Sequence, residues 1–199
     1  MVPQQKTLKY DIHVFTGIIA ILVIIGLVFI YSSSAVYALE RFHNAHFFLR
    51  KHGYGIILGL GALLVGRLLP LRMIQHGAPL FFVTTLVLTG LTMFSPFAVR
   101  IHGSSRWLNL AGFVFQPSEL LKIAFVMYLA YLLAKKESHI RSLTRTYLPL
   151  LCIMGITSVI LLRQPDFGMA VTLALTAFIL MFIAHIPLPY LGYTLGAFI

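Results

Sequence analysis

Charge is scarce in this sequence, and acidic charge is the scarcest of all. Charged residues make up 10% of the 199 residues, whereas an ordinary soluble domain has about 25%. Because 59% of the residues are hydrophobic, a water-soluble fold of this length could not bury them. An ordinary soluble domain is therefore excluded, and lipid is the expected solvent. The single cysteine, Cys152, excludes an intrachain disulfide.

Signatures of nucleotide and metal binding are also missing. The sequence has no glycine-rich phosphate-binding loop, and its eight histidines show no metal-ligand spacing. These residues therefore predict no metal site. The net charge of +10 would suggest nucleic acid in a soluble protein, but here the basic residues occupy short loops between apolar runs. Contact with membrane lipids explains them better, and no nucleic-acid partner is expected.

What the sequence does have is a series of long apolar runs. About 20 apolar residues cross a hydrocarbon core of ~30 Å. We expect an all-α fold, a polytopic membrane helix bundle of about six transmembrane helices within a single transmembrane domain, residues 1–199. The apolar residues after Pro187 look like the start of a seventh helix. The predicted spans are 14–37, 54–69, 79–99, 117–134, 147–162 and 167–186.

Orientation follows from the basic residues of the short loops, because cytoplasmic loops carry more Lys and Arg. With the N-terminus inside, the inner side has more basic residues than the outer side, and the run 135–145 is the densest part of this bias. We therefore predict a cytoplasmic N-terminus. Headgroup contact and an outward site for an anionic substrate are alternative explanations of the outer basic residues. These are Arg41, Arg50, Lys51, Arg100, Arg106 and Arg163.

Two acidic residues, Glu119 and Asp166, stand at the mouths of predicted spans. Each follows a Gln-Pro pair, and proline suits the first helical position while an acid in the first turn suits the positive end of the helix dipole. Lys122 is one turn deeper than Glu119 and can pair with it. Under the predicted topology both mouths open on the outer side. Helix starts with one structural ion pair would explain these residues, but we favour a polar outer cavity.

The segment 102–107 lies on the same predicted side. Its glycine and serines allow a tight backbone with free N–H donors. Arg106 can bind a phosphate with two donors, and Trp107 suits the membrane interface. An ordinary interfacial anchor is the alternative interpretation.

Three stretches carry a resemblance to the SEDS family, the shape, elongation, division and sporulation proteins that include FtsW, RodA and SpoVE. They are Ile-Tyr-Ser-Ser-Ser-Ala at 30–35, the run 103–122 with Gly-Ser-Ser-Arg-Trp-Leu and Phe-Gln-Pro-Ser-Glu-Leu-Leu-Lys, and Gln-Pro-Asp-Phe-Gly at 164–168. The middle stretch is the most specific. Residues 40–51 look more like the FtsW and sporulation branch than like RodA.

The resemblance implies a fold of about ten helices, of which this chain would form the N-terminal half. Family members are peptidoglycan glycosyltransferases that polymerise lipid II in cell division and cell shape. They act at the outer face of the bacterial inner membrane, here expected at the division site. The implied partners are lipid II, a class B penicillin-binding protein, other division proteins and membrane lipids. The aspartate usually assigned to catalysis belongs to the family's second half, so this chain is expected to contain no catalytic residue.

Site roles follow from the same resemblance. Glu119, Lys122 and Asp166 match polar residues that line the family's central cavity and support catalysis. Asp166 would support the polymerisation site, through a divalent cation (Mg or Mn) or through the surroundings of the catalytic aspartate, and no other cofactor is expected. Arg106 would either meet the pyrophosphate of lipid II or order the outer loop. The expected substrate-binding group is Arg106, Trp107, Gln116 and Gln164.

Two other functions fit the sequence. A polar cavity among spanning helices also suits a flippase or transporter of lipid-linked sugars. A non-catalytic scaffold for a penicillin-binding protein suits a chain without the catalytic aspartate. Whether these 199 residues are active alone is left open by the sequence.

Overall fold

The computed structural model describes residues 3–94, 98–101, 104–110 and 113–198. The chain divides into two compact units, Met1–Leu69 and Pro70–Ile199, and each is described by itself. The single domain expected from the sequence stays a prediction. In chain order the elements are α1 (Pro3–Phe42), α2 (Phe47–Leu68), α3 (Leu71–Leu91), β1 (Ala98–Ile101), β2 (Ser104–Leu110), β3 (Phe113–Phe115), α4 (Pro117–Lys135), the 3-10 turn η1 (Glu137–His139), the π-turn η2 (Leu143–Tyr147), α5 (Leu148–Arg163), α6 (Phe167–Ile183) and α7 (Leu188–Phe198).

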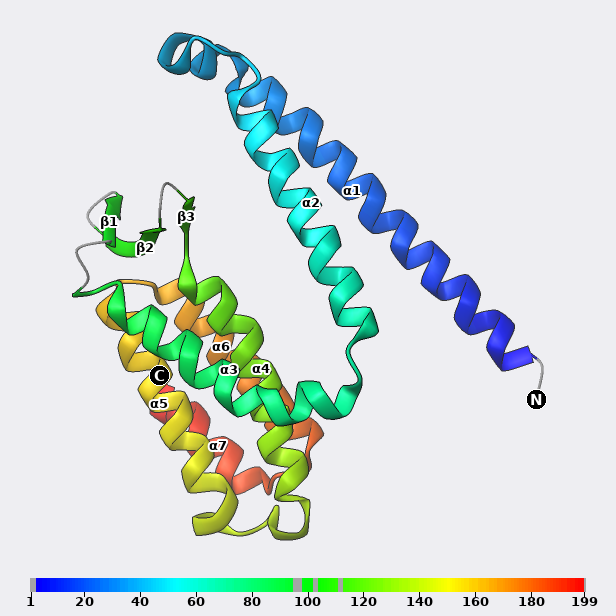
Figure 1. Cartoon of the computed structure of the whole chain (residues 1–199). Coiled ribbons are helices and arrows are strands. Elements are labelled where there is room, and N and C mark those ends of the chain that lie inside the picture. Colours follow the sequence, from blue (N-terminus) through cyan, green and yellow to red (C-terminus); the bar gives the residue numbers. More distant parts are fainter. Residues whose placement is uncertain (1–2, 95–97, 102–103, 111–112, 199) are drawn as a thin grey trace. The chain divides into compact units, whose positions relative to one another are not determined.

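The first unit is a hairpin of α1 and α2 (Figure 1). Aromatic rings pack where the two helices meet, with the ring centroids of Phe42 and Phe47 4.1 Å apart and those of Tyr31 and His46 5.3 Å apart. No residue of α2 is buried, as suits a helix whose apolar side chains face lipid. The helix α1 continues past the serines at 32–34 to Phe42, so the end of the first helix predicted near residue 37 is wrong. Hydroxyls of Ser33 and Ser34 bond to carbonyls one turn earlier, which leaves the helix unbroken.

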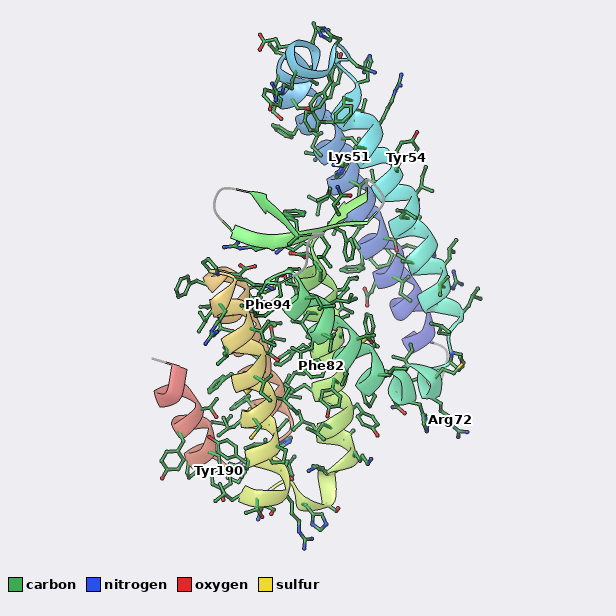
Figure 2. The ribbon with its side chains drawn as sticks, turned by 60° about the vertical axis from the view of Figure 1, so that its left-hand side comes forward. Lys51, Tyr54, Arg72, Phe82, Phe94 and Tyr190 are labelled. Atoms are coloured by element: carbon green, nitrogen blue, oxygen red, sulfur yellow. The ribbon has the colours of Figure 1, made fainter. Side chains whose placement is uncertain are left out.

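The second unit is a helix bundle capped by a small sheet (Figure 1). Helix α4 packs against α3 and α6, and α5 packs against α6. Phe82 of α3 stacks on Tyr128 of α4, with ring centroids 4.8 Å apart (Figure 2). The side chains buried between these helices include Leu121, Phe125, Leu129, Leu150, Met154, Leu161, Leu173 and Met181.

Five helices of the described chain are long and apolar enough to cross a membrane, namely those in α1, α2, α3, α4 and the segment Leu143–Arg163. The sixth predicted span is α6, whose 17 residues extend about 25 Å at ~1.5 Å per residue. It is a shorter apolar helix rather than a sixth full-length one. The all-α polytopic architecture is confirmed.

The third predicted span, 79–99, is placed too late in the sequence. Helix α3 begins at Leu71 after Pro70 and contains Pro79 in its interior. It closes with tight turns in which the N–H groups of Met93 and Phe94 donate to carbonyls three residues earlier. Residues 95–97 of the predicted span lie outside the described residues. Pro79 lies inside the helix rather than at its first position, and the apolar residues from Ala98 onward form a strand rather than the end of the helix.

The sheet has the order β1–β2–β3, and both pairs are antiparallel. Trp107 lies opposite Val99, and Leu108 lies opposite both Ala98 and Phe115. The tight loop predicted at 102–107 is therefore wrong for its described part, since 104–107 belong to the central strand. His102 and Gly103 lie outside the described residues. A central strand uses its N–H groups in ladders on both sides, which argues against free donors.

Candidate functional site

The polar side chains meet at one end of the 70–199 unit. Helix α3 ends there, α4 begins there, and the turn from α5 into α6 lies beside them, with β2 next to that turn. We use "polar cluster" for Arg106, Gln116, Gln164 and Asp166, which these elements bring together. Four of the seven site residues predicted from the sequence are in it.

Asp166 is the centre of the polar cluster. It is the N-cap residue of α6, and its Oδ1 accepts from the Met169 N–H at 3.4 Å. Arg106 Nη1 lies 3.5 Å from Oδ1, and Gln116 Nε2 donates to Oδ2 at 3.3 Å. Only 11% of the Asp166 side chain is exposed, so its charge depends on these partners rather than on water. The sequence placed Asp166 in the first turn, but Pro165 precedes the cap and the helix begins one residue later.

Arg106 holds the turn that carries Asp166. Its Nε donates to the Gln164 carbonyl at 3.0 Å, and its Nη2 donates to the Pro165 carbonyl. With the ion pair to Asp166, three nitrogens of one guanidinium bind three consecutive residues. A planar guanidinium has donors in a fixed fork and suits such an arrangement.

Gln164 ties the same turn to α3. Its Nε2 donates to the Thr89 carbonyl at 2.6 Å and to the Thr92 hydroxyl at 2.7 Å. The residue is 2% exposed, and its Oε1 has no hydrogen-bond partner within the part of the chain that the structure describes. The Thr89 carbonyl lies in the last turn of α3, where it also accepts from the N–H and the hydroxyl of Thr92.

Gln116 links α4 to α6. Its second amide hydrogen bond goes to Ser118 Oγ at 2.8 Å, and Ser118 is buried. Pro117 occupies the start of α4, as predicted, with Glu119 in the first turn. Sequence reasoning missed Ser118, Thr89 and Thr92. Ser118 belongs to the quoted motif but was given no role, and the two threonines gave no signal because the predicted third span put them in mid-helix.

Glu119 and Lys122 form the predicted i, i+3 pair, with Nζ and Oε2 3.0 Å apart. Their side chains are 58% and 39% exposed, so neither is buried within the part of the chain that the structure describes. The pair faces outward from α4 because the opposite face, with Leu121 and Phe125, packs into the core. It makes no direct bond to the polar cluster among the described residues.

One hollow is lined by residues from both the polar cluster and the pair of Glu119 and Lys122. It has a volume of about 490 Å³ and is lined by Trp107, Phe115, Gln116, Glu119 and Leu120. Gln116 belongs both to this wall and to the polar cluster. Six of the seven predicted site residues thus lie in the cluster or along the hollow, and Lys122 joins through Glu119.

The carboxylates here do not suit a divalent cation held by this chain alone. The oxygens of Asp166 face a guanidinium and an amide, and that of Glu119 faces an ammonium. The described residues also contain no group of three or more His, Cys, Asp or Glu side chains that could hold a metal ion. Hard cations take several oxygen ligands, so further ligands would have to come from elsewhere.

These observations define a class of protein. The chain is an all-α, multi-pass membrane protein whose helix ends hold a largely buried carboxylate, paired with arginine and amide groups.

The chain belongs to the FtsW, RodA and SpoVE family of cell cycle proteins, which it matches over residues 12–199. It is 35% identical over 176 residues to a Geobacter sulfurreducens protein named "Probable peptidoglycan glycosyltransferase FtsW". It is 37% identical over 177 residues to the protein of that name from Trichlorobacter lovleyi. These matches cover 88% of this chain but 47% and 46% of the relatives. The chain spans about half the length of the curated relatives it matches.

Solved structures agree on the fold. RodA of Thermus thermophilus matches with a TM-score of 0.65 and 24% identity, over 86% of this chain and 57% of that one. A chain from work on "a peptidoglycan synthase complex" matches with a TM-score of 0.66 and 24% identity, over 87% of this chain and 51% of that one. At this identity the likeness establishes the fold alone. The resemblance inferred from the three sequence stretches is confirmed.

Proposed function

We propose that this chain supplies the N-terminal half of a peptidoglycan glycosyltransferase that polymerises lipid II in cell division and cell shape. The observation that carries the proposal is the polar cluster, in which β2, α4 and the α5–α6 turn converge on the carboxylate of Asp166. The names of the FtsW relatives support the activity. Two of the three family stretches, 103–122 and 164–168, contribute Arg106, Gln116 and Asp166 to this one group.

In the proposed enzyme, Arg106 is a positioning residue. Of the two roles expected from the sequence, pyrophosphate contact and loop ordering, the geometry favours ordering. Its guanidinium already binds Asp166 and the carbonyls of Gln164 and Pro165. Few of its five donors remain for a substrate.

Trp107, Gln116 and Glu119 line the hollow beside the cluster, and we assign it to the polar part of lipid II. Lys122 supplies positive charge next to it for the pyrophosphate. Gln164 does not line the hollow, and it supports the site by fixing the turn between α5 and α6 against α3.

The chemistry itself needs a base outside this chain. In the whole protein an acidic group would remove the proton from a sugar hydroxyl, whose oxygen then attacks the anomeric carbon while undecaprenyl pyrophosphate leaves. Asp166 supports that step by fixing the positions of Arg106 and Gln116 beside the reacting groups. A divalent cation remains part of the proposal only if further ligands come from outside these residues.

The proposed setting is the bacterial inner membrane at the division site. The N-terminus would be cytoplasmic, which puts the polar cluster on the outer side where lipid II is polymerised. A class B penicillin-binding protein is the proposed partner, supported by the likeness to a chain of a peptidoglycan synthase complex.

The test is Asp166→Asn in the whole protein. The amide keeps the size of the side chain but removes the charge that faces Arg106, and we expect polymerisation of purified lipid II to fall about 100-fold, since small misplacements at a reacting site have effects of that size. Glycan products resolved on a gel provide the measurement. The matched control is Glu137→Gln, an exposed acid in η1 outside the cluster, which should polymerise normally. Normal polymerisation by the Asp166→Asn protein would show that the polar cluster has no role in the reaction.

A lipid-linked-sugar carrier is the second candidate, and the open hollow beside the cluster is the observation that favours it. Vesicles that contain the whole protein and dye-labelled lipid II distinguish the two functions. Movement of the dye across the membrane without any glycan polymer would favour the carrier.

A further inference from the structure

We propose that the end of the 70–199 unit opposite the polar cluster binds the headgroup of an anionic phospholipid. A hollow of about 720 Å³ lies there. Its wall includes Arg141, from the connection between α4 and α5, and His185, from the turn between α6 and α7. Both connections lie at the end of this unit away from the small sheet (Figure 1).

Arg141 has its donors available. Its basic neighbours are engaged: Lys136 donates to the Arg145 carbonyl, and the Arg145 guanidinium lies 3.4 Å from His139 Nε2. Arg141 makes no hydrogen bond or ion pair with any residue that the structure describes. An arginine with a free guanidinium can bind a phosphate through two parallel N–H groups. His185 is exposed on the facing wall and adds a polar group to the same hollow.

The surrounding charge is positive. The segment 135–145 contains four basic residues and one acid, Glu137. Basic hollows between transmembrane helices attract the headgroups of anionic lipids. A negatively charged ligand is therefore favoured over a zwitterionic one.

The rest of the wall indicates a lipid rather than a soluble phosphate. Phe182, Ile183 and Leu188 contribute to it and are 60%, 63% and 72% exposed. A soluble anion would gain nothing from three apolar side chains, whereas the acyl chains of a phospholipid would cover them. The hollow also lies at the ends of α4, α5, α6 and α7, the level at which headgroups meet spanning helices. Phosphatidylglycerol has the required charge and chains.

The experiment uses a tryptophan reporter in the 199-residue chain. Trp107→Phe removes the one native tryptophan, and Leu188→Trp places a new one on the wall of the hollow, where the side chain is largely exposed. The chain is reconstituted in vesicles of phosphatidylcholine in which brominated phosphatidylglycerol or brominated phosphatidylcholine quenches the fluorescence. We expect quenching to show about fivefold preference for phosphatidylglycerol, equivalent to about 1 kcal/mol for one basic residue.

Three variants of the reporter chain decide the outcome. Arg141→Gln should remove almost all of the preference for phosphatidylglycerol, and Arg141→Lys should keep most of it. Arg72→Gln is the matched control, because Arg72 is exposed at the start of α3, at the same end of the unit but outside this wall (Figure 2). It should keep the full preference. Circular dichroism verifies that every variant is helical.

Three results would overturn the proposal. The first is equal quenching by the two brominated lipids in the reporter chain. The second is a loss in Arg72→Gln as large as that in Arg141→Gln, because the attraction would then be a property of the whole basic end. The third is a helical Arg141→Lys chain without any preference, because the site is proposed to recognise charge.

Discussion

At one end of the 70–199 unit the charged side chains of the polar cluster, Arg106 and Asp166, are paired and largely shielded from solvent. At the other end the charged side chains are mostly exposed and form no ion pair among the described residues. Asp166 is 11% exposed and bonded to three elements, whereas Arg141 and Glu137 are exposed. A withdrawn carboxylate must be compensated by fixed partners, so it orders the backbone around it. Exposed basic residues are satisfied by water or headgroups and leave the backbone unconstrained. The end with the polar cluster is organised like a binding site, whereas the end with Arg141 is organised like a surface in contact with lipid headgroups.

The largest expected effect tests that difference directly. Arg106→Ala should lower the free energy of unfolding by about 2–3 kcal/mol, because it leaves Asp166 without its cation and two carbonyls without donors. Arg141→Ala removes the same side chain at the other end and should change it by less than about 0.5 kcal/mol. Unfolding in mixed micelles of sodium dodecyl sulfate provides the measurement.

Equal stability of Arg106→Ala and Arg141→Ala would contradict this difference between the two ends of the unit. Arg106→Lys sharpens the result, since lysine keeps the charge but lacks the planar fork of donors. Its stability should lie between those of Arg106→Ala and the parent chain.

A smaller loss in the free energy of unfolding is expected at the hydrogen bonds between Gln164 and α3. Gln164→Leu removes both bonds to α3 but also removes the unpaired Oε1. The net loss should be about 1–2 kcal/mol. Thr92→Val, which removes one acceptor for Gln164 Nε2, should lose about 1 kcal/mol. A more stable Gln164→Leu chain would show that the orphaned oxygen outweighs the bonds.

Much of the cluster was accessible from sequence because its signals are local. Each Gln-Pro-acid pattern marks the start of a helix, and two starts on the same predicted side put Gln116 and Asp166 near one another. Arg106 was expected on that side as well. Its direct pairing with Asp166 was not, because that contact joins residues 60 positions apart through a strand.

The missed parts depend on where an apolar run changes structure. Residues 79–99 read as one continuous span, yet the helix ends at Leu91 and β1 begins at Ala98. Apolar residues suit both a buried strand and a helix, so their composition does not mark the boundary. The helix end carries Thr89 and Thr92 to Gln164, and a predicted end eight residues too late, at 99 rather than at Leu91, concealed both.

The smallest stability effect belongs to the exposed pair of Glu119 and Lys122, which lies beside the cluster but shares the solvent exposure of the opposite end. Glu119→Gln should change the free energy of unfolding by less than about 0.5 kcal/mol, since exposed i, i+3 pairs contribute little. If the pair acts on substrate through the hollow, the same variant in the whole protein should still lower lipid II polymerisation, because its charge faces that hollow. Loss of activity with unchanged stability would assign the pair to function. Unchanged activity would show that the pair is surface charge without a role in the reaction.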